Sequence, residues 1–264
     1  MNSSLALPMN AFSPLKILSK KSMLILVGFQ LVALFVLWVF APTFVPTPAD
    51  TAHSIVSLGG DGLFGELVTS FLLNVQALAV VTVICLILAY ATVLPFFQPI
   101  AKFFSLLRFL SLVGITVFFV EIFGRSPHGL KLSLLVYGVG VFFITSMIDV
   151  VKKVPKELKD LARTLGFSEW RVVWEVIIVG QVDQVFDVLR TNAAMSWALV
   201  PLVEGIMRTE GGIGTILLDQ SHHFHMSAVV AVVIVITLMG ALQDYGIGMT
   251  RKFLCPWADL RLER

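Results

Sequence analysis

Long apolar segments separated by short polar ones dominate the pattern of hydrophobic and polar positions along the chain. A helix that crosses the bilayer core needs about 20 mostly apolar residues. Six segments meet this requirement, so the pattern predicts an all-α membrane protein with six transmembrane helices. The predicted spans are Met23–Phe44, Ser70–Val93, Phe103–Phe123, Leu130–Val150, Val185–Met207 and Met226–Met249.

Composition supports the membrane assignment, because 57% of the 264 residues are hydrophobic and 14% are charged, against about 25% charged residues in soluble domains. The net charge of +2 comes without a basic cluster interleaved with aromatic residues, so nothing indicates nucleic-acid binding. The first apolar run is too long for the core of a signal peptide, and we expect it to remain as the first span. Cys85 lies inside an apolar run and Cys255 in the C-terminal tail, so we expect no disulfide between them.

Basic residues predict the orientation, because cytoplasmic segments carry an excess of lysine and arginine. With the N-terminus inside, we expect a cytoplasmic segment over 1–22, a transmembrane domain over 23–249 and a cytoplasmic tail over 250–264. A multi-pass protein of the bacterial inner (plasma) membrane, with both termini cytoplasmic, follows from this. The cytoplasmic set is Lys16, Lys20, Lys21, Lys102, Arg108, Lys152, Lys153, Lys156, Lys159, Arg163, Arg171, Arg190, Arg251, Lys252, Arg261 and Arg264, against Arg125, Lys131 and Arg208 outside.

The most polar internal segment runs from 152 to 180 between spans four and five, and it reads as two short helices joined by a turn. Pro155 suits a first helical position, Gly166 suits a left-handed residue at a helix end, and Ser168 can cap the next helix ahead of Glu169. A helix of about three turns with one apolar stripe is unstable alone in water, so we expect it to lie in a groove of another protein. The stripe is Leu158, Leu161, Ala162 and Leu165.

The chain carries none of the common catalytic or phosphate-binding motifs: GxxxxGK[ST], HExxH, CxxC and GxSxG are all absent from the sequence. The glycine-rich stretch Arg208–Gly214 lacks the strand and helix context of a phosphate loop. We therefore expect a protein that is not itself an enzyme, and any energy-driven work needs a separate subunit that hydrolyses a nucleotide.

The sequence Asp160-Leu161-Ala162, with Gly166 four residues after Ala162, resembles the EAA loop in permease subunits of ATP-binding-cassette importers. The run LARTLGFSEWRVVWEVIIV is especially similar to the nitrate, sulfonate, taurine and bicarbonate branch. Trp197, Glu204 and Gly211–Gly214 match that branch further on. The resemblance covers about Ser70–Met249 and is strongest over Val154–Leu218. Asp160 and Leu161 replace the usual Glu and Ala. Val179 replaces a usual proline, which predicts a less sharply ended second helix.

This resemblance implies the fold of a type I importer permease, in which the short helix docks on a cytoplasmic ATPase subunit as a coupling helix. The ATPase would bind ATP and Mg, and this chain would bind no cofactor. Two copies, most simply a homodimer, would line a path for a small oxyanion (nitrate, sulfonate, taurine or bicarbonate) that an extracytoplasmic binding protein delivers. Lys159 and Arg163 would form a polar rim around the docked stripe. The residues implied in ATPase coupling are Leu158, Asp160, Leu161, Ala162, Arg163, Leu165 and Gly166.

Polar residues inside spans are costly and usually face protein or a water-filled cavity. Arg190, Asn192, Trp197 and Glu204 of the fifth span are therefore pore-lining candidates. The alternative is internal packing, or snorkelling in the case of Arg190.

Two further clusters have structural alternatives of their own. His222, His223 and His225 precede the sixth span and are candidates for the outer mouth of the pore; metal binding is the weaker reading, since no cysteine is near. Trp170 and Trp174 share a helix face and are expected to be packing or interface anchors.

Two other kinds of protein fit the composition. A self-contained channel or secondary transporter predicts inverted repeats, and the chain shows no clear repeat. A membrane scaffold would use the same cytoplasmic segment to recruit a protein without transporting anything.

Overall fold

The computed structural model describes residues 20–40, 42 and 45–257, and these residues form helices and connecting turns with no strand. The prediction of an all-α membrane protein is confirmed. Most of the predicted segment 1–22, the end of the first predicted span at Phe44 and the last seven residues of the predicted tail lie outside the described residues.

Four long helices form the centre of the molecule: α3 (Leu63–Ala91), α6 (Pro127–Lys153), α9 (Val182–Ile206) and α11 (Met226–Leu254). Helix α6 packs against both α3 and α9, and its buried side chains Leu135, Val139, Phe143 and Met147 belong to the largest apolar core. A Cβ on Gly138 would lie 3.0 Å from the Leu199 side chain. Small residues of this kind let membrane helices approach closely, where packing rather than water drives association.

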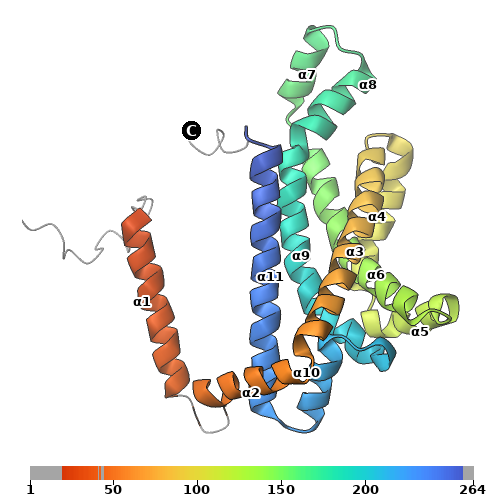
Figure 1. The fold of residues 1–264 in the computed structure, drawn as a ribbon. Helices are drawn as coiled ribbons and strands as arrows, with labels where there is room; N and C mark the ends of the chain where they lie inside the picture. The colour runs from red at the N-terminus through yellow and green to blue at the C-terminus, as the bar shows by residue number, and fades with distance from the viewer. Residues whose placement is uncertain (1–19, 41, 43–44, 258–264) are drawn as a thin grey trace, which may run out of the picture.

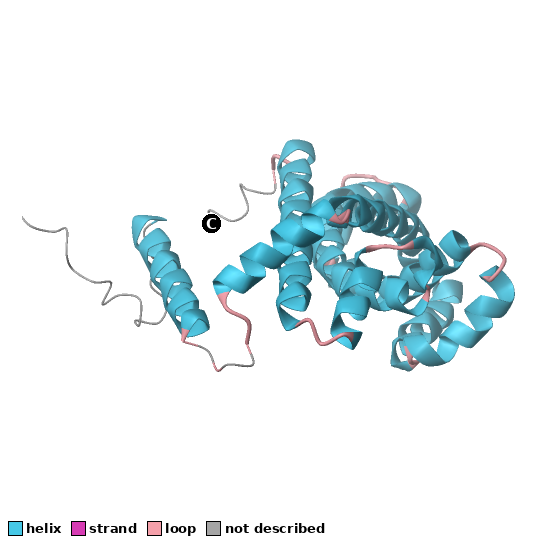
Figure 2. Cartoon of the chain, turned by 60° about the horizontal axis from the view of Figure 1, so that its bottom comes forward, coloured by secondary structure: helices cyan, strands magenta, loops and turns pink. Residues whose placement is uncertain are grey.

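Helix α1 (Lys20–Val39) stands apart from this bundle in both views of the chain (Figures 1 and 2). None of its apolar window is buried. Within the described residues, α1, α3, α6 and α11 are long and apolar enough to cross a membrane. Helix α9 has 25 residues and is long enough, but it carries four charged side chains and is not in this set. The count of six spans stays a prediction.

The predicted third span, Phe103–Phe123, is not one helix. The chain from Pro95 to Phe123 divides instead into two parts. The first is η2 (Pro95–Phe97), α4 (Gln98–Leu106) and η3 (Leu107–Phe109), and the second is α5 (Leu112–Phe123). The two parts are bent by 112°, because Leu110 and Ser111 both have extended backbone with ψ near 130°. Helix α5 has 12 residues, so it is about 18 Å long and too short to cross the membrane alone. If the two bent parts are counted as one broken span, the described residues contain five candidate membrane spans.

The segment 41–68, which precedes the second predicted span, contains a helix that sequence reasoning missed. Helix α2 (Pro48–Gly60) begins where Thr47 accepts a hydrogen bond from the Asp50 backbone N–H at 3.2 Å. Pro48 occupies its first position, where a missing N–H costs nothing. Helix α2 packs against α11 and lies with α10 (Ile213–His222) at the end of the bundle opposite to α7 (Figure 1).

The segment between α6 and α9 projects beyond the bundle as α7 (Lys156–Thr164) and α8 (Glu169–Val172) (Figure 1). Helix α8 continues through a π-helical segment, η4 (Val173–Ile178), and a short 3-10 segment, η5 (Val179–Gln181), directly into α9. The expectation of a second helix without a sharp end at Val179 is confirmed.

Candidate functional site

The turn between α7 and α8 is built by a glycine. Gly166 has a φ of +83°, its N–H donates to the Arg163 carbonyl at 2.9 Å, and the Phe167 N–H donates to the Ala162 carbonyl at 3.1 Å. These two bonds form a Schellman motif, which satisfies the last carbonyls of a helix. No atom lies within 4 Å of where a Cβ would stand, so Gly166 is required for its backbone conformation and not for space.

Two details of the predicted caps differ from the structure. Pro155, predicted at the first helical position, is instead the N-cap of α7, which begins at Lys156. Ser168 occupies the N-cap position of α8, but its side chain makes no capping hydrogen bond. The neighbouring carboxylate of Glu169 instead pairs with a side chain of α7.

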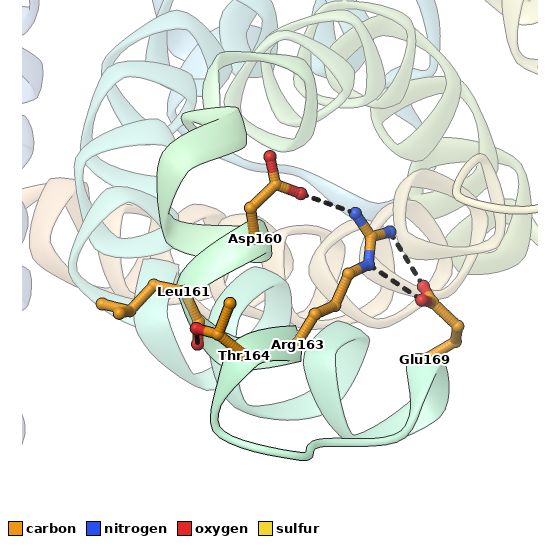
Figure 3. Close-up of polar contacts among 5 residues, drawn as sticks. All are labelled: Asp160, Leu161, Arg163, Thr164 and Glu169. Carbon is orange, nitrogen blue, oxygen red and sulfur yellow. Dashed lines mark hydrogen bonds and ion pairs between the residues drawn. The ribbon is translucent and has the colours of Figure 1, made fainter.

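That partner is Arg163, whose guanidinium joins the two helices (Figure 3). Its Nε and Nη2 donate to the two carboxylate oxygens of Glu169 at 2.8 and 2.9 Å, and its Nη1 donates to Asp160 Oδ1 at 2.8 Å. These hydrogen bonds hold the pKa of the Glu169 carboxyl below its ordinary value. They hold the pKa of the Arg163 guanidinium above its ordinary value. Arg163 therefore braces the turn, where the sequence indicated only a polar rim.

The apolar stripe of α7 remains largely uncovered. Leu158, Leu161 and Leu165 are 43%, 56% and 68% exposed, whereas Ala162 is buried. A cavity of about 280 Å³ lies between this stripe and Phe167 and Val176 of the following segment. Trp170 and Trp174 are also exposed, so this end of the molecule presents a concentrated apolar surface. Large exposed apolar surfaces mark sites of interaction.

The predicted pore-lining residues do not gather at one place. Arg190 lines a cavity of about 650 Å³ near the α7 end of α9 and α11, where its Nε and Nη2 donate to the Asp244 carboxylate at 2.8 and 2.5 Å. Asn192 is buried, and its amide donates to the Val188 carbonyl of its own helix at 2.8 Å.

Trp197 belongs to a polar cluster inside the bundle. Its indole N–H donates to Gln243 Oε1 at 2.6 Å, and the Asn74 amide donates to the same oxygen at 3.3 Å. The Ser196 hydroxyl in turn donates to Asn74 Oδ1 at 2.7 Å. This cluster links α3, α9 and α11 through hydrogen bonds, as buried polar groups require.

Glu204 is buried at the other end of α9, where it holds the glycine-rich loop 211–214. Its two carboxylate oxygens accept from the Ser70 hydroxyl at 2.6 Å and from the Gly214 N–H at 2.8 Å. Ser70 Oγ in turn accepts from the Ile213 N–H at 2.8 Å. Two further charged side chains hold the loop: Glu66 accepts from the Gly212 N–H, and the buried Lys131 donates to the Gly211 carbonyl at 2.8 Å.

Comparison with known proteins finds relatives of low identity that match about half of this chain. No protein-family model matches the chain. A protein of Methanocaldococcus jannaschii named as an ABC transporter permease is 27% identical over 124 residues, 46% of either chain. The bicarbonate transport permease CmpB of Synechococcus elongatus is 24% identical over 121 residues, 43% of this chain and 44% of CmpB. The taurine transport permease TauC of Escherichia coli is 25% identical over 127 residues, 48% of this chain and 46% of TauC.

The curated relatives of this chain are permeases of ATP-binding-cassette transporters. The matched part spans less than half the length of each of these three relatives.

The three histidines predicted at the outer mouth of the pore, His222, His223 and His225, lie between the end of α10 and the start of α11. His223 and His225 stack with ring centroids 5.9 Å apart. The His223 Nδ1 lies 2.8 Å from the Asp219 carbonyl oxygen, and the His225 Nδ1 lies 2.9 Å from Gln220 Oε1. His222 is the last residue of α10 and is exposed. The described part of the chain holds no group of three His, Cys, Asp or Glu side chains arranged for a metal ion.

Sequence reasoning missed three partners of the glycine-rich loop, which are Glu66, Ser70 and Lys131. A signal existed for one of them, because Lys131 lies at the start of the fourth predicted span, where a lysine needs an acceptor. The loop carbonyl that accepts from Lys131 lies 80 residues away in sequence, and no local pattern points to it. Cys85 and Cys255 are both free and buried.

Proposed function

We propose that the chain is the permease subunit of an ATP-driven importer for a small oxyanion, with α7 as its coupling helix. The observation that carries this proposal is the α7–Gly166–α8 turn, which presents three exposed leucines at one end of the bundle. The resemblance of this segment to the EAA loop and the permease relatives support the same role.

In this mechanism the leucine stripe fills a groove on a cytoplasmic ATPase subunit, which binds ATP and Mg. Full burial of a leucine side chain contributes about 1.5–3 kcal/mol, so three partly exposed leucines can hold a docked helix. Arg163 fixes α7 relative to α8, and α8 continues through η4 and η5 into α9. A displacement of α7 by the ATPase is thereby passed to α9, which carries Arg190, Asn192, Trp197 and Glu204.

The substrate class rests on the relatives, whose names concern bicarbonate, taurine and aliphatic sulfonates. These substrates share a small oxyanion group, and nitrate fits the same description. Two copies of the chain would enclose the path, and an extracytoplasmic binding protein would deliver the anion near α2, α10 and the three histidines. Arg190, with its guanidinium on a cavity wall, is the residue of α9 best suited to an anion.

The test is copurification from the native host. The tagged chain, solubilised in mild detergent, should bring down an ATPase with a Walker motif in stoichiometric amount, identified by mass spectrometry. Leu161→Glu should abolish this recovery, because it places a charge in the stripe. Lys156→Glu is the matched control, because five residues along a helix turn the side chain by about 140°, away from the stripe.

Two outcomes would contradict the proposal. Equal loss of the ATPase in both variants would mean that charge, and not the leucine stripe, governs docking. A wild-type chain that remains alone after crosslinking would favour a self-contained channel or secondary transporter.

A further inference from the structure

A second cavity, of about 720 Å³, lies between α4, α6 and α7. Figure 1 shows α7 at one end of the bundle. Four basic side chains line the cavity, together with one acid, Asp149. Four positive charges and one negative charge give its wall an excess of three positive charges. The basic residues are Lys102 of α4, Arg108 of η3, Lys152 of α6 and Lys159 of α7.

Among the described residues, none of these four basic side chains takes part in a salt bridge, although Arg108 lies over the Phe109 ring at 5.0 Å. The cavity lined by Arg190 is different, because Arg190 is paired with Asp244 and Arg251 with Asp187. Among the described residues, this leaves only Lys252 of its three basic lining residues without an ion pair. A concave wall with unpaired charges of one sign concentrates counter-ions. The cavity between α4, α6 and α7 is therefore the stronger site for an anion.

The uncharged part of the wall is mostly apolar and includes Leu106, Ile148 and Ile177. Its polar members are Thr92, Gln98, Ser105 and Thr145. A free inorganic anion can meet the basic side chains, but it gains nothing from the apolar part of this wall. A phospholipid matches both parts, because its phosphate can meet the lysines while its acyl chains lie along the apolar side chains. Basic pockets between membrane helices on the cytoplasmic side bind lipid headgroups in this way.

We infer that this cavity binds the phosphate headgroup of an anionic phospholipid. Lys159 comes from the coupling helix and Ile177 from the segment that follows it, whereas Lys102 and Lys152 come from the bundle. A headgroup held by all of these residues joins α7 to α4 and α6. The lipid thus sets how firmly the coupling helix is held against the bundle, a property separate from the oxyanion path.

The experiment measures lipid binding to the full chain, with whatever subunits copurify, by native mass spectrometry. Phosphatidylglycerol is compared with phosphatidylcholine at equal concentration. We expect wild type to retain phosphatidylglycerol preferentially, and the triple variant Lys102→Gln, Lys152→Gln, Lys159→Gln to bind it at least about tenfold more weakly. The control triple Lys21→Gln, Lys153→Gln, Lys156→Gln removes the same charge outside the cavity and should bind phosphatidylglycerol like wild type.

Equal weakening in both triples, or none in either, would overturn the inference. The corresponding Lys→Arg triple should restore binding, which separates loss of charge from misfolding. If a triple does not fold, Lys152→Gln against its neighbour Lys153→Gln makes the same comparison with one charge.

A competition arm distinguishes the lipid from a free anion. Sodium phosphate should displace phosphatidylglycerol no better than sodium chloride at the same ionic strength, and Leu106→Gln should weaken lipid binding. Displacement specific to inorganic phosphate, with no effect of Leu106→Gln, would assign the cavity to a free oxyanion instead.

Discussion

At the scale of single residues, the glycine-rich loop shows how little room separates α10 from α9. A Cβ on Gly214 would lie 2.5 Å from both the Cα and the carbonyl oxygen of Pro201. Gly212, with a φ of +109°, has the Glu204 carboxylate where its own Cβ would stand. The backbone of this loop therefore packs directly on α9, and its amides reach the buried Glu204 and Ser70 because no side chain intervenes.

We expect Gly214→Ala to destabilise the protein, because the added Cβ would meet backbone atoms of Pro201, which cannot move aside as a side chain could. Overpacking of this kind costs about 1–3 kcal/mol. The midpoint of thermal unfolding in detergent, measured by fluorescence-detected gel filtration, should fall. Gly65→Ala is the control, because Gly65 lies in the first turn of α3 with open space around it. Equal midpoints for the two variants would mean that the loop does not pack on α9 as described.

At the scale of elements, two features hold the α7–α8 turn. One is the left-handed Gly166. The other, the brace, is the set of hydrogen bonds from Arg163 to three carboxylate oxygens of Glu169 and Asp160. The glycine fixes the direction of the chain. The brace fixes the separation of the two helices, since α7 and α8 together contain few buried side chains. Salt should weaken this brace, because its charges are exposed.

Arg163→Gln should loosen the turn. We expect hydrogen exchange of the Gly166–Glu169 amides to rise about two- to fivefold, in line with the modest strength of exposed ion pairs. Lys156→Gln, which removes an exposed charge from the same helix, should leave this exchange unchanged.

The brace should also depend on pH. The pKa of Glu169 in the folded turn lies below its ordinary value of 4.5, so the brace contributes fully above that value and is lost as the pH falls through the folded pKa. Exchange corrected for its intrinsic pH dependence should therefore be constant above about pH 6 and rise below about pH 4.5. A constant corrected rate down to pH 3 would contradict this.

At the scale of the whole molecule, the two ends of the bundle differ in character. One end carries α7, α8 and the basic last turn of α11, and the other carries α2 and α10 (Figure 1). In the orientation predicted from the basic residues, the α7 end is cytoplasmic.

Labelling in intact cells checks this orientation. Asp61→Cys at the end of α2 should react with a membrane-impermeant maleimide, whereas Lys156→Cys at the start of α7 should react only after the cells are opened. The native Cys85 and Cys255 are buried and should give a low background. Labelling of Lys156→Cys alone in intact cells would reverse the topology.

The sequence predicted those features that depend on neighbouring residues. Apolar runs located α3, α6 and α11 to within a few residues at most ends, and Gly166 with its flanking leucines located the α7–α8 turn. The bend at Leu110–Ser111 escaped prediction, because neither residue breaks a helix on its own. The hydrogen bonds that join Glu204 to Ser70 and Asn74 to Gln243 escaped as well. They link residues 134 and 169 positions apart, and only the packed helices bring these side chains together.

The π-helical segment η4 (Val173–Ile178) affects how α7 is rotated relative to α9. A single turn of π-helix accommodates one residue more than an α-helical turn, and one residue corresponds to about 100° of rotation about a helix axis. If η4 became a regular α-helix, the leucine stripe of α7 would be rotated about the axis of this helix while α9 stayed in place. The π-helical segment therefore sets which side of α9 the leucine stripe of α7 faces.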